Sequence, residues 1–171
     1  MIITITGLPG SGKTSAAKEL ARHLHIKHYS MGDLFRKIAK KKKIPLLELT
    51  KKGRKLSDEL DEMQKHIAKT HKNAIIDSRL GAYLIKNADY RIYVYASLKT
   101  RVRRIAERDK KSYKAALRET LAREREELKH YKKEYNIDYR NKNLYNIIIE
   151  TNGLAVEDTV KKIISMMNKL K

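Results

Sequence analysis

The chain has 171 residues, 41% of them hydrophobic and 35% charged, which is enough for one domain with an apolar core and excludes a disordered chain. It contains no cysteine, so disulfides and thiolate metal sites are excluded and a reducing cytoplasm is the expected location. No apolar run approaches the roughly 20 residues of a membrane span, so we expect no association with a membrane.

The charge of the chain is strongly basic. Lys and Arg number 40 against 20 acidic residues, which gives a formal net charge of +20. This indicates either a nucleic-acid-binding protein or an enzyme for anionic substrates with a lysine-rich, solvated surface. The excess lysines are spread along the chain, and with one Phe and no Trp only Tyr could stack on bases. We therefore do not expect nucleic acid to be the main partner.

Five runs rich in β-branched or aromatic residues predict strands, and helical patterns separate them. The runs cover residues 2–6, 27–30, 74–77, 91–96 and 144–150. Apolar residues at helical spacing predict sheet-packing helices at 13–24 and 155–170. This alternation predicts an α/β fold, an open parallel five-stranded sheet with helices on both faces.

A glycine-rich segment follows the first predicted strand. Residues 7–14 read GLPGSGKT and match the pattern G-x-x-x-x-G-K-[ST] between a strand and a helix, the context of a phosphate-binding loop. Gly10 and Gly12 let the backbone adopt conformations that a Cβ would penalise, so that N–H groups can point at phosphate oxygens. Lys13 would reach the β- and γ-phosphates, and the hydroxyl of Thr14 or Ser15 would bind Mg²⁺.

Asp77 ends the predicted strand at 74–77. In proteins with a phosphate-binding loop, an acidic residue at this place holds a magnesium-bound water. An aspartate can also cap a following helix, because its carboxylate accepts hydrogen bonds from backbone N–H groups. We favour the magnesium role, which makes Thr14 and Asp77 the expected metal site.

Three classes of nucleotide-binding protein remain after the loop is identified. A motor ATPase normally needs a longer chain, and a GTPase would carry an NKxD-like segment, whereas NKN at 141–143 lacks the acid. A small kinase needs several guanidinium groups converging on two anions, because planar guanidinium suits phosphate and stays charged. Arg101, Arg104 and Arg108 share one helix face, and further arginines stand at 36, 79, 123 and 125.

Residues 112–134 predict a helix of a different character. Large aliphatic residues are nearly limited to Leu117, Leu121 and Leu128, in a stretch crowded with Arg, Glu, Lys and Tyr. So thin an apolar stripe predicts weak anchoring. The pattern fits a mobile lid and a projecting surface helix equally well.

Taken together, the segments GLPGSGKT, SMGDLFR, DSRLGAYL, RRIAER and YKKEYNID resemble those of the nucleoside monophosphate kinases, and most closely those of the short archaeal-type cytidylate kinases. The resemblance covers nearly the whole chain in the right order. It implies the P-loop NTPase fold in a single kinase domain over residues 1–171, with an acceptor-binding helical insert near 33–72 and a lid near 108–135. The implied reaction transfers the γ-phosphoryl group of ATP to CMP, or to dCMP, giving ADP and a diphosphate.

The resemblance also implies roles for individual residues. Asp33 and Arg36 would border the acceptor, Arg79 would touch its phosphate or base, and Asp61 would belong to the acceptor-binding helical region. Arg104 would lie over the adenine. Lys13, Arg108 and Arg123 would act on the transferring phosphoryl group. The donor ATP would be held by Gly7, Leu8, Pro9, Gly10, Ser11, Gly12, Lys13, Thr14 and Ser15. A cytoplasmic monomer with small-molecule substrates is expected.

Two positions depart from the resemblance. Many archaeal cytidylate kinases carry Thr where Lys13 stands, and His130 stands where relatives often have Arg. The lost lid charge could be supplied by Arg125, Lys129 or Lys132. Two alternatives stay open: an adenylate or uridylate acceptor, and an ATP-dependent RNA-binding or ribosome-assembly factor on a kinase-like fold.

Overall fold

The computed structural model describes residues 1–45, 48–49 and 54–170, and it confirms the predicted α/β architecture. All five strands are parallel, in the order β2-β3-β1-β4-β5. They are β1 (Ile2–Thr6), β2 (Lys27–Ser30), β3 (Ala74–Asp77), β4 (Tyr90–Tyr95) and β5 (Ile147–Glu150). The strand order places β1 at the centre, so the loop after β1 leaves the carboxyl edge of the sheet between two neighbours, where such sheets bind ligands.

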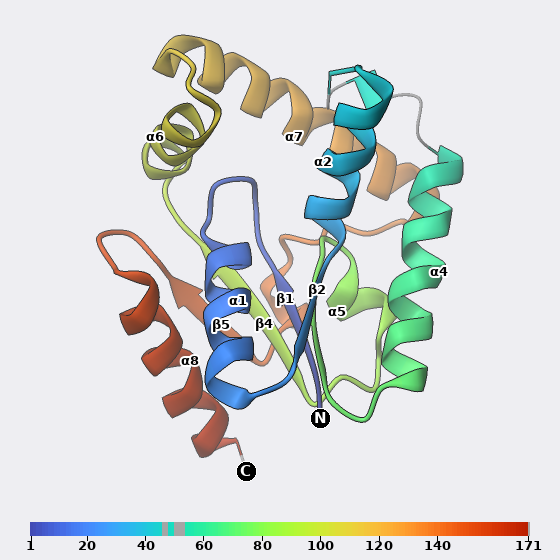
Figure 1. The fold of residues 1–171 in the computed structure, drawn as a ribbon, viewed down its shortest axis with the longest axis vertical. Helices are drawn as coiled ribbons and strands as arrows, with labels where there is room; N and C mark the ends of the chain where they lie inside the picture. The colour runs from blue at the N-terminus through green and yellow to red at the C-terminus, as the bar shows by residue number, and fades with distance from the viewer. Residues whose placement is uncertain (46–47, 50–53, 171) are drawn as a thin grey trace.

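Helices cover both faces of the sheet, as predicted (Figure 1). On one face, α1 (Lys13–Leu24) and α8 (Val156–Lys169) pack on the side chains of Ile3, Ile75 and Ile92. On the other face, α2 (Met31–Lys42), α4 (Arg54–Thr70) and α5 (Gly81–Leu84) cover the alternate strand residues. The strand residues alternate between the two cores because successive side chains of a strand point to opposite faces.

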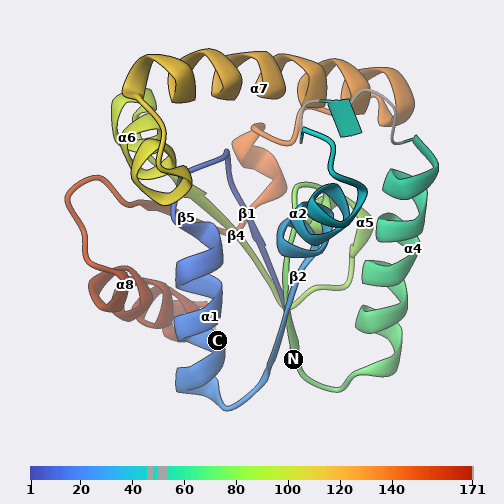
Figure 2. The same cartoon turned by 45° about the horizontal axis from the view of Figure 1, so that its top comes forward.

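Two further helices lie beyond the carboxyl edge of the sheet. α6 (Leu98–Asp109) follows β4, and α7 (Tyr113–Tyr135) crosses above the edge (Figure 2). The described part of α7 is anchored near both ends, because Ala116 and Leu117 pack on α6 whereas Leu128, Tyr131 and Tyr135 pack with Leu80 and Tyr139. The middle of the helix instead buries polar residues, which explains why its apolar stripe looks thin in the sequence.

The last strand is shorter than predicted. The sequence predicts a strand over 144–150, whereas a 3₁₀ turn covers Lys142–Leu144 and β5 begins at Ile147. The Asn141 side chain accepts a hydrogen bond from the backbone N–H of Asn143 and closes this turn. Local side-chain bonds of this kind compete with strand pairing. The region expected to form the acceptor insert, 33–72, contains most of α2 and all of α4, and its residues 46–47 and 50–53 lie outside the described residues.

Candidate active site

The glycine-rich loop has the conformation that its sequence predicts. Gly10 and Gly12 adopt positive φ angles of 77° and 89°, which a residue with a Cβ rarely tolerates. A Cβ on Gly10 would also stand 2.4 Å from the carbonyl oxygen of Arg101, so α6 lies directly against the loop. Gly12 is the N-cap of α1 and offers no side-chain cap. The first N–H groups of α1 are therefore free to meet an anion, which the helix dipole also favours.

Lys13 and Thr14 meet Asp77 at the mouth of this loop. The Thr14 hydroxyl donates to Asp77 Oδ2 over 2.6 Å, and Lys13 Nζ lies 3.6 Å from Asp77 Oδ1. Burial lowers the pKa of Lys13 to about 8; repulsion from Arg79, Arg36 and Arg123 adds to the shift, and Asp77 opposes it. Lys13 is thus a desolvated cation surrounded by other cations, and the arrival of phosphate would relieve that repulsion.

Magnesium fits this arrangement. Asp77 is buried, and its Oδ1 has no hydrogen-bond partner among the described residues, so a hard carboxylate oxygen is left available. The Thr14 hydroxyl could supply a second oxygen, since it lies 2.6 Å from the other carboxylate oxygen. Mg²⁺ in nucleotide sites typically takes one or two protein oxygens and completes its shell with phosphates and water. No set of three or more acidic, His or Cys side chains that could hold a metal occurs among the described residues.

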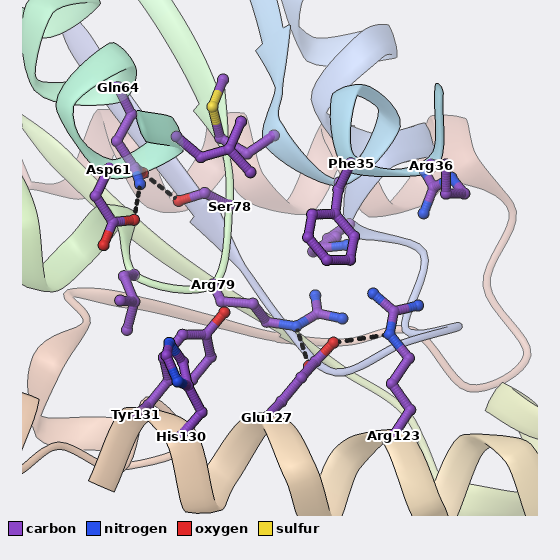
Figure 3. Close-up of a pocket in the computed structure, with 15 residues that line it drawn as sticks. Phe35, Arg36, Asp61, Gln64, Ser78, Arg79, Arg123, Glu127, His130 and Tyr131 are labelled. Carbon is purple, nitrogen blue, oxygen red and sulfur yellow. Dashed lines mark hydrogen bonds and ion pairs between the residues drawn. The ribbon is translucent and has the colours of Figure 1, made fainter. Parts of the chain in front are cut away.

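Two cavities open at the carboxyl edge and meet at four cations. A cleft of about 950 Å³ runs along the loop between α6 and α7, and a smaller cavity of about 90 Å³ lies between α2, α4 and α7. Both cavities are lined by Lys13, Arg36, Arg79 and Arg123. The guanidinium groups of Arg36, Arg79 and Arg123 converge in Figure 3. The site therefore has two compartments with a cationic junction between them.

Glu127 organises two of these arginines. Its side chain is buried, with Oε2 2.9 Å from Arg79 Nε and Oε1 2.9 Å from Arg123 Nε. The two guanidinium groups lower the pKa of Glu127 to about 2 against the opposing effect of burial. Arg79 Nη1 also donates to the Gly7 carbonyl over 2.7 Å. Because Glu127 meets both arginines at Nε, Arg79 Nη2 and the two Nη atoms of Arg123 are left without a bond to Glu127 or to the Gly7 carbonyl.

The arginines of α6 divide into two kinds. Arg101, which the helix-face argument groups with the phosphate-binding arginines, is buried and instead supports the loop by donating to Pro9 O over 3.1 Å and pairing with Glu124. Arg104 lies in the larger cleft, where it donates to Thr151 O over 2.9 Å beside Gly12. Arg108 also lines that cleft, but its side chain is half exposed and ion-paired to Asp109 at 2.7 Å.

The smaller cavity has a second end, away from the four cations. Its walls there are the apolar side chains of Met31, Phe35, Leu60 and Leu80. A polar network crosses this end: Ser78 Oγ donates to Gln64 Oε1 over 2.6 Å, and Gln64 Nε2 donates to Asp61 Oδ1 over 2.9 Å. The Tyr135 hydroxyl donates to Asp61 Oδ2. Burial raises the pKa of Asp61 in spite of these bonds.

Most of the residues singled out from the sequence come together here. The loop residues from Pro9 to Ser15 line the larger cleft together with Asp33, Arg104 and Arg108, whereas Asp61 and His130 line the smaller cavity. Although the resemblance implied that Gly7 and Leu8, the first two residues of the loop, hold ATP, they line neither cavity. The same is true of the three residues considered as replacements for a lid charge at position 130, namely Arg125, Lys129 and Lys132.

The sequence reasoning missed Glu127, Gln64 and Ser78. Glu127 follows Arg123 by four residues, the spacing of an ion pair on one helix face, and this signal could have identified it. Gln64 and Ser78 had no comparable signal, because they meet only when α4 packs beside β3.

Comparisons with known proteins identify the family and the fold. Residues 2–153 match the model of the cytidylate kinase-like family. The chain is 36% identical over 172 residues to the cytidylate kinase of Sulfurisphaera tokodaii, covering 98% of this chain and 96% of that protein. It is 40% identical over 167 residues to the cytidylate kinase of Pyrobaculum islandicum, covering 94% and 89%. Among solved structures, shikimate kinase from Bacteroides thetaiotaomicron superposes with a TM-score of 0.65 at 17% identity, covering 98% of each chain, which shows the shared P-loop kinase fold.

Proposed function

Because the chain belongs to the cytidylate kinase-like family, we propose that it transfers the γ-phosphoryl group of ATP to CMP, giving ADP and CDP. The observation that carries the proposal is the junction of Lys13, Arg36, Arg79 and Arg123, which line both cavities at once. A kinase must hold two polyanions end to end, and shared cations at the meeting point neutralise both of them.

The larger cleft is the compartment for ATP. It is floored by the loop from Pro9 to Ser15, whose backbone N–H groups would bind the phosphates. Arg104 is held by Thr151 beside Gly12, a position from which its planar guanidinium would stack on the adenine. When bound, Mg²⁺ would neutralise the β- and γ-phosphate oxygens, held by Thr14 and Asp77.

The smaller cavity is the compartment for CMP. Arg36, Arg79 and Arg123 would bind its phosphate, whereas Phe35 and the neighbouring apolar residues would pack on the base. An oxygen of that phosphate attacks the γ-phosphorus of ATP, a new P–O bond forms, and the bond to the β-phosphate oxygen breaks to release ADP. The attacking oxygen is already anionic, so the step needs alignment and charge neutralisation and no general base.

α7 would serve as the lid of this reaction. It carries Arg123 and Glu127 across the top of both compartments, and Arg108 stands just before it at the rim of the larger cleft. Release of Arg108 from Asp109 would let it reach the transferring phosphoryl group. Closure would also exclude water, which otherwise hydrolyses ATP.

A coupled assay of ADP release tests the function. CMP, dCMP, UMP and AMP would be compared as acceptors at saturating ATP, with ATP alone as the blank for hydrolysis. The proposal expects the largest kcat/KM for CMP or dCMP, and equal values for AMP and CMP would overturn it. No helix in the described part of the chain is long and apolar enough to span a membrane. The expectation of a cytoplasmic monomer stays a prediction.

The alternative of an RNA-binding factor has a separate signature. It would show RNA binding that weakens steeply with salt, together with negligible turnover of CMP. The distribution of charge argues for the enzyme. The cations of the site are mostly arginines that are bonded to other residues of the protein, whereas lysines such as Lys40 to Lys43 at the end of α2 are exposed.

A further inference from the structure

Thr151 follows the last residue of β5 and contacts two segments of the larger cleft. Its backbone N–H donates to Tyr95 O over 2.9 Å, which continues the pairing of β5 with β4. The side chain is 2% exposed. Its hydroxyl oxygen lies 2.8 Å from the carbonyl oxygen of Ser11 in the glycine-rich loop and 3.0 Å from Arg104 Nη1 on α6. One buried hydroxyl therefore joins α6 to a loop residue that stands 140 positions earlier in the chain.

The hydrogen bonds through this hydroxyl have a fixed direction. A guanidinium group has donors only, so Arg104 Nη1 donates to Thr151 Oγ1. The hydroxyl has one proton of its own, and Ser11 O at 2.8 Å is a nearer acceptor for it than Tyr95 O at 3.3 Å. A chain of two hydrogen bonds thus runs from Arg104 through Thr151 to the Ser11 carbonyl. The charge of the guanidinium group strengthens this chain, because it polarises the hydroxyl between the two bonds.

Thr151 holds the plane of the Arg104 guanidinium group at two points. Nη1 donates to the side-chain oxygen of Thr151, and Nη2 donates to its backbone oxygen over 2.9 Å. The contact of Nη1 with Gly10 O is longer, at 3.4 Å. Two bonds from one planar group to one residue leave that group little freedom to rotate. Thr151 therefore determines how the guanidinium group lies in the larger cleft, which Arg104 lines.

Thr151 also fixes one peptide group of the glycine-rich loop. The carbonyl oxygen of Ser11 and the N–H of Gly12 belong to the same trans peptide, so they point in opposite directions. Because the Thr151 hydroxyl holds the oxygen, the N–H is kept pointing away from Thr151. Gly12 lines the larger cleft, and its N–H has no hydrogen-bond partner in the described part of the chain. The bond from Thr151 thus keeps this N–H available for an anion in the cleft.

These two effects concern the two ends of one ligand. The inference rests on the proposed function, which puts ATP in the larger cleft with its phosphates on the loop and its adenine against Arg104. We propose that Thr151 is a positioning residue for ATP: it holds Arg104 and the peptide between Ser11 and Gly12 at a fixed separation before ATP arrives. Groups that are already ordered cost less to bind. Thr151 lines neither cavity, so it acts through the two groups that it holds.

The Thr151→Val variant supplies the first test. Valine keeps the branched shape and removes the hydroxyl, so Arg104 and the Ser11 carbonyl lose their shared partner. Affinities are measured by calorimetric titration without an acceptor, for ATP and for inorganic tripolyphosphate, which lacks the nucleoside. We expect the Kd for ATP to rise by about 10- to 100-fold and the Kd for tripolyphosphate to rise by a smaller factor, because only ATP needs both groups. Thr151→Ser keeps the hydroxyl and should restore the affinity for ATP.

Thr159→Val is the matched control. Thr159 is also a buried threonine, 3% exposed, and its hydroxyl donates to the carbonyl oxygen of Ala155 over 3.0 Å. It lies on α8 and lines neither cavity, so its substitution should leave both affinities unchanged. If this control weakens ATP binding as much as Thr151→Val does, the effect comes from stability and the inference is overturned.

Thr151→Ala keeps the test open if Thr151→Val does not fold. Alanine puts no methyl group in the place of the hydroxyl, and it should raise the Kd for ATP in the same way. Unchanged affinities in a folded variant that lacks the Thr151 hydroxyl would overturn the inference.

A double-variant cycle with Arg104→Met tests the route through the guanidinium group. Methionine keeps an unbranched side chain and removes the group that Thr151 holds. In this background, Thr151→Val should raise the Kd for ATP only by the factor that it gives for tripolyphosphate, because only the effect on the loop remains. If Thr151→Val raises the Kd for ATP by the same factor in both backgrounds, Thr151 does not act through Arg104 and the inference is overturned.

The titrations also separate this inference from the proposed function, because they need no acceptor. If ATP binding depends on Thr151 as expected and CMP is not phosphorylated, the proposed function fails while the role of Thr151 stands. If CMP is phosphorylated and ATP binding does not depend on Thr151, the inference fails while the proposed function stands.

Discussion

Glu127 Oε2 lies 2.9 Å from Arg79 Nε, although the two residues are 48 positions apart and belong to different elements. Arg79 follows β3 at the edge of the sheet, whereas Glu127 belongs to α7 above that edge. The same carboxylate stands 2.9 Å from Arg123 Nε on its own helix. Glu127 thus keeps two guanidinium groups at a fixed separation, and it contributes the negative charge that lets them approach.

Replacement of Glu127 by Gln should weaken the acceptor site. A neutral amide can accept from one arginine but presents N–H groups to the other, so one guanidinium would turn away. We expect the KM for CMP to rise by about 10-fold and kcat to fall by about 10- to 100-fold, because the lost order affects both binding and the transition state. Loss of one partner of a buried ion pair should also cost about 3 kcal/mol of folding free energy.

Glu124→Gln provides the control on the same helix. Glu124 pairs with Arg101, which is buried and supports the loop at Pro9, so its loss should act on the KM for ATP. Steady-state kinetics with each substrate varied in turn separates the two effects. If both variants raise the same KM to the same extent, Glu127 acts only by fastening α7.

Lys13 should make ATP use depend on pH near 8. Its pKa is lowered to about 8, mainly by burial, so the side chain is charged below that pH and loses its proton as the pH rises through it. We expect kcat/KM for ATP, which reports the free enzyme, to fall above about pH 8. The fall in kcat should occur at higher pH, because bound phosphates favour the charged form.

Lys13→Arg is the variant that isolates this group. Arginine stays charged at every pH of the experiment, so the variant should lose the alkaline decline even if its overall rate is low. A profile of kcat/KM that keeps the same decline in Lys13→Arg would assign the decline to another group.

The sequence was sufficient to predict the loop and the strands, apart from the start of β5, because their signals are local. A glycine pattern between a strand and a helix determines the backbone at Gly10 and Gly12, and short β-branched runs define β1 and β3. The contacts between site residues from different elements could not be predicted in the same way. The contact of Ser78 with Gln64 and the pairing of Arg79 with Glu127 join residues 14 and 48 positions apart, and they depend on where α4 and α7 dock.

Arg101 shows the limit of helical spacing as evidence. It shares a helix face with Arg104 and Arg108, and spacing alone assigns all three to phosphate. Burial separates them: Arg101 is 5% exposed and bonded to Ala96 O and Pro9 O, so its charge serves the loop. Which of several arginines on one helix face meets the ligand depends on how closely the helix packs against its neighbours. A single sequence does not give that packing.

Gly10 should be intolerant of any side chain. Its φ is 77°, and a Cβ would stand 2.4 Å from the Arg101 carbonyl oxygen, so Gly10→Ala must shift either the loop or α6. We expect the KM for ATP to rise by at least about 10-fold, because phosphate binding depends on backbone N–H positions. Gly153→Ala is the control: Gly153 has a φ of 66°, and a Cβ there would meet nothing within 4 Å. It should lose about 1 kcal/mol of stability and keep its KM for ATP. Equal kinetic effects would mean that backbone strain alone matters.

Asp77 and Thr14 should determine the Mg²⁺ concentration that the protein needs for activity. The Thr14 hydroxyl bonds to Asp77 Oδ2, and the other carboxylate oxygen has no hydrogen-bond partner among the described residues. Asp77→Asn removes the charge that attracts a hard cation and keeps the shape. We expect the half-saturating Mg²⁺ concentration to rise by about 10-fold or more, in titrations of both activity and ATP binding.

The binding titration separates a metal role from a purely structural one. In Asp77→Asn, the affinity for ATP in the presence of excess chelator should change little, whereas the gain in affinity on adding Mg²⁺ should be lost. Thr14→Ala should also lose the gain in ATP affinity on adding Mg²⁺. Thr14→Ser should keep that gain, because the hydroxyl is the part of Thr14 that would bind the ion. If the two single variants each lose the gain in affinity and the double variant loses no more, the two side chains act on one ion. An unchanged dependence on Mg²⁺ in Asp77→Asn would instead leave Asp77 as the counter-charge of Lys13, 3.6 Å away.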